Sequence, residues 1–123
     1  MLDSTFLIDL LRGVEAAGTR LNELVGQRRP LRVPAMVLLE VAGGAQRPDE
    51  AAQRIAAAFL ITPVDEQIAR EGARIGSALI RKGRFPGWTD IAIAATAIHF
   101  DEELVSRNER HFRNVAGLLL ETY

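Results

Sequence analysis

The sequence predicts an α/β sandwich, in which helices cover both faces of a parallel β-sheet, and three observations indicate this. Apolar runs too short for helices alternate along the chain with longer segments of helical periodicity. Pro30 and Pro34 bracket one of these runs and Pro63 closes another, which favours short strands. Segment 91–98 is almost wholly alanine and isoleucine, and a helix that is apolar all round is buried. Short strands that alternate with helices are typical of a parallel sheet covered on both faces.

Residues that start or stop regular structure bound the individual elements. Gly13 ends the first helix, Pro48 opens the fourth and Asp65 caps the fifth. The predicted helices are 4–12, 15–27, 35–41, 48–59, a fifth that starts after Asp65 and includes Leu79, a sixth opened by Thr89 and Asp90, and a turn or short helix at 108–112. The predicted strands are 1–2, 31–33, 60–62, 103–105 and 118–120.

The composition is that of an ordinary globular domain, which we expect to span residues 1–123. Of the 123 residues, 48% are hydrophobic and 25% charged, and none is cysteine, which excludes a disulfide scaffold, a thiol nucleophile and thiolate zinc sites. No apolar run approaches the roughly 18 residues of a membrane span, and no secretory signal opens the chain. We therefore expect a cytoplasmic protein without membrane contact. The formal charge of −1 excludes nucleic-acid binding through the overall field, so a phosphate substrate needs a local cluster or a metal.

Three carboxylates stand at positions where they call for an explanation. Asp3 follows the first strand and Asp90 opens the most apolar helix, and helix capping is an adequate explanation for each alone, although Thr89 is an equal candidate for the second cap. Glu40 interrupts the apolar stretch 36–41, where burial of an unpaired carboxylate costs several kcal/mol. An exposed stripe on a half-buried helix or a salt bridge to an arginine explains Glu40 equally well.

The three acids together point to a metal site. The carboxyl ends of parallel strands meet at one edge of a sheet, so these side chains can converge there. Converged carboxylates repel one another unless a hard cation neutralises them, and oxygen ligands favour Mg²⁺ or Mn²⁺. Such an ion activates water and neutralises charge on phosphate, as phosphodiester hydrolysis requires. Ser106 and Asn108 follow another predicted strand and can join the same edge, although both residue types also favour turns.

Four segments resemble, in order, the motifs of the PIN-domain family, and specifically its VapC-like toxin ribonucleases. They are LDSTFLIDLLRG at 2–13, VLLEV at 37–41, TDIAIAATA at 89–97 and LVSRNERHF at 104–112. The resemblance covers nearly the whole chain. It implies a three-layer α/β/α sandwich with a short-stranded parallel sheet.

The resemblance also implies a metal-dependent endoribonuclease toxin of a type II toxin–antitoxin pair, with tRNA or another structured RNA as substrate. Asp3 and Asp90 match the metal-ligand aspartates, Glu40 the acid that acts through water, and Ser106 and Asn108 the polar positions of the fourth motif. We therefore expect Mg²⁺, for which Mn²⁺ can substitute, a cognate antitoxin as partner, and a homodimer.

The fourth motif departs from the family pattern. Asn108 stands where many relatives have an acid, and His111 where an Asp or Glu often precedes Phe112, which favours one tightly bound metal ion over two. We interpret His111 as a turn cap and Asp9 as a structural residue paired with Arg12. Arg84, Arg107 and Arg110 are candidate phosphate contacts. Trp88 is either a base-stacking residue or part of the core.

Three alternatives compete with this hypothesis. A PIN scaffold without catalysis that only binds a partner is the first, and retention of all three acids speaks against it. A phosphoacceptor receiver domain requires paired acids after the first strand and a late lysine, but only Asp3 stands at that junction and no lysine follows Lys82. A haloacid-dehalogenase-like phosphatase requires an Asp where Thr5 stands.

Overall fold

Short parallel strands run through the centre of the molecule. The computed structural model describes residues 1–123. It pairs β1 (Arg32–Pro34) with β2 (Leu60–Thr62), and β3 (Leu104–Val105) with β4 (Leu120–Glu121), both in parallel. Leu2 joins the two pairs, since it forms a parallel bridge with Val105 and its N–H donates to the carbonyl of Arg32 over 2.9 Å. Residues 1–3 therefore occupy the middle of one parallel arrangement.

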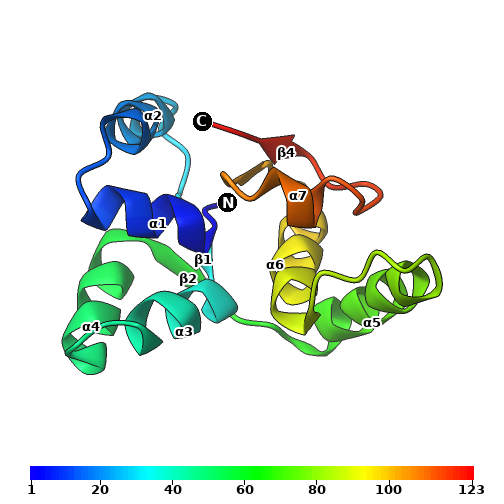
Figure 1. Ribbon diagram of the computed structural model, residues 1–123. Coiled ribbons are helices and arrows are strands. Elements are labelled where there is room, and N and C mark those ends of the chain that lie inside the picture. The colour runs from blue at the N-terminus through cyan, green and yellow to red at the C-terminus, as the bar shows by residue number, and fades with distance from the viewer.

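Helices lie on both sides of these strands. In Figure 1, α1 to α4 lie in the left half of the view and α5 and α6 in the right half, with β4 above α6. Their bounds are α1 (Ser4–Leu11), α2 (Glu15–Gly26), α3 (Ala35–Gly43), α4 (Pro48–Ala58), α5 (Glu66–Arg81), α6 (Trp88–His99) and α7 (Glu109–Phe112). This arrangement confirms the predicted α/β/α sandwich with a short-stranded parallel sheet. None of the helices combines the length and apolar composition needed to cross a bilayer.

The core forms where both helix layers meet the strands. Leu2, Phe6 and Ile93 are completely buried, and α6 contributes six buried residues, as its alanine and isoleucine content predicts. Phe112, at the end of α7, is 1% exposed. Anchoring of the short α7 in the core fixes the segment that follows β3.

Asp9 is a buried acid whose partners differ from the predicted one. Its Oδ2 accepts a hydrogen bond of 2.8 Å from the Tyr123 hydroxyl and lies 3.1 Å from an Arg107 guanidinium nitrogen. The predicted pairing with Arg12, one helical turn away, is therefore wrong. The Tyr123 ring also packs edge-on against Phe6, with centroids 5.0 Å apart. Asp9 thus connects α1 to the end of the chain.

This contact predicts a pH-dependent contribution to stability. Burial and the hydrogen bond to Asp9 raise the pKa of Tyr123 from its ordinary value of 10.0 to about 12. Because the folded-state pKa lies above the unfolded one, the contact stabilises fully below pH 10 and is lost as the pH rises toward 12. We expect Tyr123→Phe to lower the free energy of unfolding by about 1 kcal/mol at pH 8. In urea titrations, the difference in free energy of unfolding between the wild type and the variant should disappear between pH 10 and 12.

The variant is a matched control, because Tyr123 is the chain's one tyrosine and all other titrating groups remain unchanged. Parallel losses of stability in both proteins above pH 10 would contradict the predicted role of the Tyr123–Asp9 contact.

Candidate active site

Asp3 lies at the carboxyl end of the central strand segment, and hydroxyl donors hold it there. It is the N-cap of α1, where its carboxylate accepts a long hydrogen bond from the Thr5 N–H, so the capping interpretation is confirmed. Its Oδ2 also accepts from the Thr5 hydroxyl over 2.9 Å and from the Ser106 hydroxyl over 2.6 Å. Its Oδ1 receives only a 3.4 Å contact from Ser4. One carboxylate oxygen is therefore fixed, and the other remains available although the residue is 1% exposed.

The loop after β3 is connected to the same aspartate. Ser106 is completely buried, and its hydroxyl oxygen accepts the Asn108 backbone N–H over 3.0 Å. The Thr5 hydroxyl oxygen accepts the Arg107 N–H over 3.1 Å. Asn108 itself is the N-cap of α7 but makes no side-chain cap bond. The fourth sequence motif thus meets the first at Asp3, in agreement with the strand-end rule.

Asp90 enters the site from the first turn of α6. The N-cap of this helix is Gly87, whose φ of +115° favours glycine. The prediction that Thr89 or Asp90 caps the helix is therefore wrong. The Asp90 side chain is 17% exposed, and its Oδ2 lies 2.7 Å from Nδ1 of His111. Burial raises the pKa of Asp90, the contact with His111 lowers it, and the charge of Asp3 raises it further.

Glu40 approaches from α3, on the exposed side of that helix. Of the two predicted explanations for Glu40, the exposed position on a half-buried helix is therefore confirmed. No arginine forms a salt bridge with Glu40. Partial burial raises the pKa of Glu40, the nearby Ser4 hydroxyl lowers it, and the charges of Asp3 and Asp90 raise it. The three carboxylates therefore lie within range of one another's charge.

The donor set fits a hard divalent cation. Burial and mutual repulsion raise the pKa values of Glu40 and Asp90, and neither arginine nor lysine forms an ion pair with Asp3, Glu40 or Asp90. Oxygen ligands with excess negative charge favour Mg²⁺ and Mn²⁺. No three acidic or histidine side chains already lie close enough to form a finished metal site. The fit to a divalent cation therefore lies in the oxygen donors and their charge.

His111 has a partner that the sequence did not predict. It does not cap a turn but faces Asp90 across the gap between α7 and α6. The available signal was its place three residues after Asn108 in the fourth motif, where relatives often carry an acid. The other histidine, His99, ends α6, and its Nδ1 lies 3.9 Å from Glu71, too far for a hydrogen bond.

The remaining candidate residues lie at the surface. Arg84 donates to the Asn114 side-chain oxygen over 3.0 Å, Arg107 pairs with Asp9, and Arg110 is exposed. Trp88 is 57% exposed, which excludes the core interpretation, and its ring covers the face of α5 at Gly76. Arg84 and Arg107 thus lie in loops and Arg110 in α7, and none of the three pairs with a site carboxylate.

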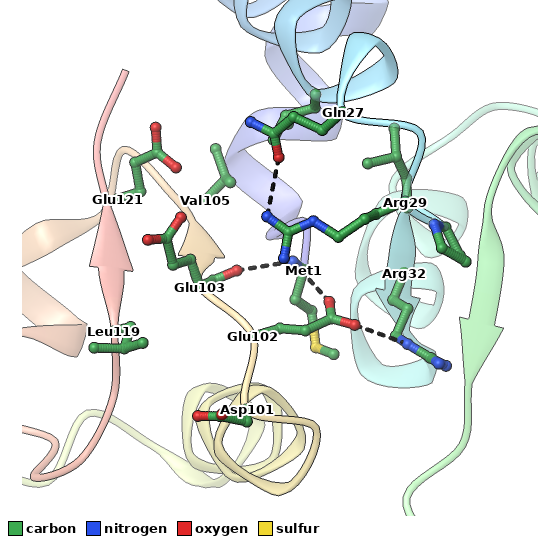
Figure 2. Close-up of a pocket in the computed structure, with 13 residues that line it drawn as sticks. Met1, Gln27, Arg29, Arg32, Asp101, Glu102, Glu103, Val105, Leu119 and Glu121 are labelled. Atoms are coloured by element: carbon green, nitrogen blue, oxygen red, sulfur yellow. Dashed lines mark hydrogen bonds and ion pairs between the residues drawn. The ribbon is translucent and has the colours of Figure 1, made fainter.

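A separate pocket lies at the amino-terminal ends of the strands. It measures about 330 Å³ and contains none of the candidate site residues. Figure 2 shows that Glu102 links the Met1 amino group to Arg32, while Arg29 bonds to Gln27. Its central acid is therefore paired with cations of the chain itself, unlike Asp3 and Glu40 at the opposite edge.

Comparison with known proteins places the chain in a family. A sequence model of the PIN domain matches residues 1–118. Ribonuclease VapC19 of Mycobacterium tuberculosis is 34% identical over 113 residues, which cover 91% of this chain and 90% of that protein. Ribonuclease VapC10 of the same organism is 34% identical over 115 residues, covering 91% of this chain and 84% of the relative.

The fold comparison agrees. The crystal structure of VapBC2 from Rickettsia felis bound to a promoter DNA fragment contains a chain that superposes with a TM-score of 0.85 at 20% identity. The match covers 100% of this chain and 97% of the other. With four motifs in order, the strand-edge carboxylates and these relatives, the chain belongs to the PIN domain family and is of the VapC type.

Proposed function

We propose that this protein is an endoribonuclease toxin of a type II toxin–antitoxin pair, and that residues 1–123 act as one cytoplasmic domain. The observation that carries the proposal is the group of three carboxylates, Asp3, Glu40 and Asp90, at one edge of the sheet without an arginine or lysine paired to them. The names of the VapC ribonucleases support RNA as the substrate.

The chain's own residues hold and orient the reactive groups. Asp3 and Asp90 would hold one Mg²⁺ ion directly and Glu40 would hold it through water. Thr5 and Ser106 fix one oxygen of Asp3, which leaves the other oxygen available to bind an ion. A bound divalent ion supplies the positive charge that activates water and stabilises the phosphorane-like transition state. Asn108 stands beside this site at the start of α7.

The substrate would be held by the exposed arginines around the carboxylates. Arg84, Arg107 and Arg110 offer planar guanidinium groups that suit phosphate. Water attacks phosphorus in line with the leaving 3′ oxygen, so hydrolysis leaves a 3′-hydroxyl and a 5′-phosphate end. We propose tRNA or another structured RNA as the target, and the formal charge of −1 implies that its phosphates are held by local contacts rather than by the overall field.

The partner is proposed to be a cognate antitoxin, and the protein itself a homodimer. Support for the antitoxin comes from the solved structure with the same fold, which is a VapBC complex bound to promoter DNA. A second structure with this fold, at a TM-score of 0.72 and 25% identity, is a toxin–antitoxin complex from Klebsiella pneumoniae.

The decisive experiment combines metal removal with an RNA substrate. Purified protein is incubated with end-labelled tRNA in Mg²⁺, in Mn²⁺, and in EDTA. We expect discrete fragments with 5′-phosphate ends in both metals and none in EDTA, because the carboxylates repel one another and the phosphate without a cation. Readdition of Mg²⁺ should restore cleavage.

Two controls make the result specific. Glu40→Gln keeps the shape of the side chain but removes its charge, and we expect it to reduce cleavage. Circular dichroism should show that both proteins are folded. A folded wild-type protein that neither cleaves RNA nor binds Mn²⁺ would contradict the proposal and favour a PIN scaffold that only binds a partner.

A further inference from the structure

The contact between His111 and Asp90 joins two elements far apart in the sequence. Nδ1 of His111 lies 2.7 Å from Oδ2 of Asp90, within the range of a charge-assisted hydrogen bond. The His111 side chain is 42% exposed and the Asp90 side chain 17%. The contact therefore lies at the border between solvent and the interior, on the side of Asp90 that faces α7.

The same pattern of hydrogen bonds occurs at both aspartates. Oδ2 of Asp3 accepts from Ser106, and Oδ2 of Asp90 is occupied by His111, so each aspartate has one oxygen fixed by segment 106–111. The other oxygen of Asp90 has no hydrogen-bond partner in the protein, and that of Asp3 has only the long contact from Ser4. Segment 106–111 thus contributes to the orientation of both carboxylates, together with Thr5 at Asp3.

The backbone around His111 is itself well fixed. Its N–H donates to the carbonyl of Asn108 over 3.2 Å, and the next residue, Phe112, is buried in the core. The Phe112 carbonyl accepts the N–H of Val115 over 3.0 Å. The imidazole is therefore presented to Asp90 by an anchored backbone, as expected for a group that orients another one.

We propose that His111 is a positioning residue, which donates its Nδ1–H to one oxygen of Asp90 and so directs the other oxygen toward the cation. The inference rests on the proposed function, because it assumes that Asp90 holds a metal. Hydrogen-bond partners of metal ligands typically change metal affinity about 10- to 100-fold when removed, because the ligand then loses its orientation. In this role His111 touches neither the ion nor the RNA.

Two amide variants separate this role from direct participation by the imidazole. The side-chain nitrogen of Asn stands close to the position of Nδ1, whereas that of Gln reaches the position of Nε2. His111→Asn therefore retains a donor to Asp90, and His111→Gln and His111→Ala do not. A role of His111 as ligand or general base requires the imidazole itself and would be lost in all three variants.

Calorimetric titration with Mn²⁺ tests the proposal without any RNA. We expect His111→Ala and His111→Gln to weaken Mn²⁺ binding about 10- to 100-fold and His111→Asn to stay within about threefold of the wild type. His99→Asn serves as the matched control and should bind like the wild type. Unchanged or tighter binding in His111→Ala overturns the proposal, and so does equal weakening in all three His111 variants. If His111→Ala does not fold, the Asn and Gln variants decide.

The ring nitrogens provide a second readout in the metal-free protein. In a ¹⁵N-resolved spectrum we expect the neutral His111 ring to carry its proton on Nδ1, and Asp90→Asn to change this signal while that of His99 stays constant. A His111 ring protonated on Nε2 in the neutral wild type overturns the proposal. Wild-type protein that binds no Mn²⁺ overturns the metal site itself, whereas normal wild-type binding with unaffected His111 variants overturns only the role of His111.

Discussion

Asp90→Asn is expected to reduce RNA cleavage by about 10³-fold or more while the protein stays folded. The substitution removes one negative charge without changing the size of the side chain. Stabilisation of the transition state by a bound cation is worth several kcal/mol, and about 4 kcal/mol corresponds to 10³-fold in rate. The measurement is the single-turnover cleavage rate of labelled tRNA in Mg²⁺.

The fold should tolerate this change because the charge of Asp90 is unfavourable where it stands. Burial and the charge of Asp3 raise its pKa, so its ionised form destabilises the metal-free fold at neutral pH, and the amide relieves this. Thermal unfolding of the variant without metal should therefore occur at the wild-type temperature or above it. Unreduced cleavage by the folded variant would remove Asp90 from the mechanism.

Asp65→Asn provides the matched control for this substitution. Asp65 caps α5 by accepting the Ile68 N–H over 2.9 Å, and asparagine caps helices about as well as aspartate. We expect this variant to keep both its stability and its cleavage rate. Loss of cleavage in both variants would point to an effect of net charge rather than of the site.

Local sequence signals predicted the fold because residues within or next to each element indicate its type and where it ends. Apolar runs closed by Pro34 and Pro63 became β1 and β2, and the all-apolar α6 became the buried helix. The observed strand ends differ from the predicted ones by one or two residues, as at β4. The hydrogen bonds of the partner strand define so short a strand, and its own sequence does not. The central place of Leu2 between Arg32 and Val105 depends on pairings distant in sequence and has no local signal.

The candidate site was predicted only in part, for the same reason. The strand-end rule brought Asp3 and Ser106 together, because it depends only on which residue follows a strand. The partners of His111 and Asp9 depend on tertiary packing instead. A histidine in a short turn and an aspartate one turn before an arginine each have an adequate local explanation, and the structure replaces both explanations with distant contacts.

Loss of the Phe112 side chain is expected to destabilise the protein strongly. Its ring is 1% exposed and ends α7, a four-residue helix too short to be stable by itself. We expect Phe112→Ala to lower the free energy of unfolding by about 3–5 kcal/mol, since truncation of a buried phenylalanine leaves a cavity. Phe100→Ala is the control, because Phe100 is 36% exposed, and its contact with Arg32 is expected to contribute about 1 kcal/mol. Urea unfolding measures both variants.

Phe112→Ala should also weaken metal binding. This effect distinguishes Phe112 from a core residue that contributes only to stability. Without the Phe112 ring, α7 loses its attachment and His111 no longer holds its place beside Asp90. In the protein that remains folded, we expect Mn²⁺ binding to weaken about as much as in His111→Ala. Phe112→Leu retains an apolar side chain in the core and should bind Mn²⁺ almost as tightly as the wild type. Wild-type Mn²⁺ affinity in folded Phe112→Ala would mean that Asp90 keeps its orientation without α7, and the core would then contribute to stability but not to the metal site.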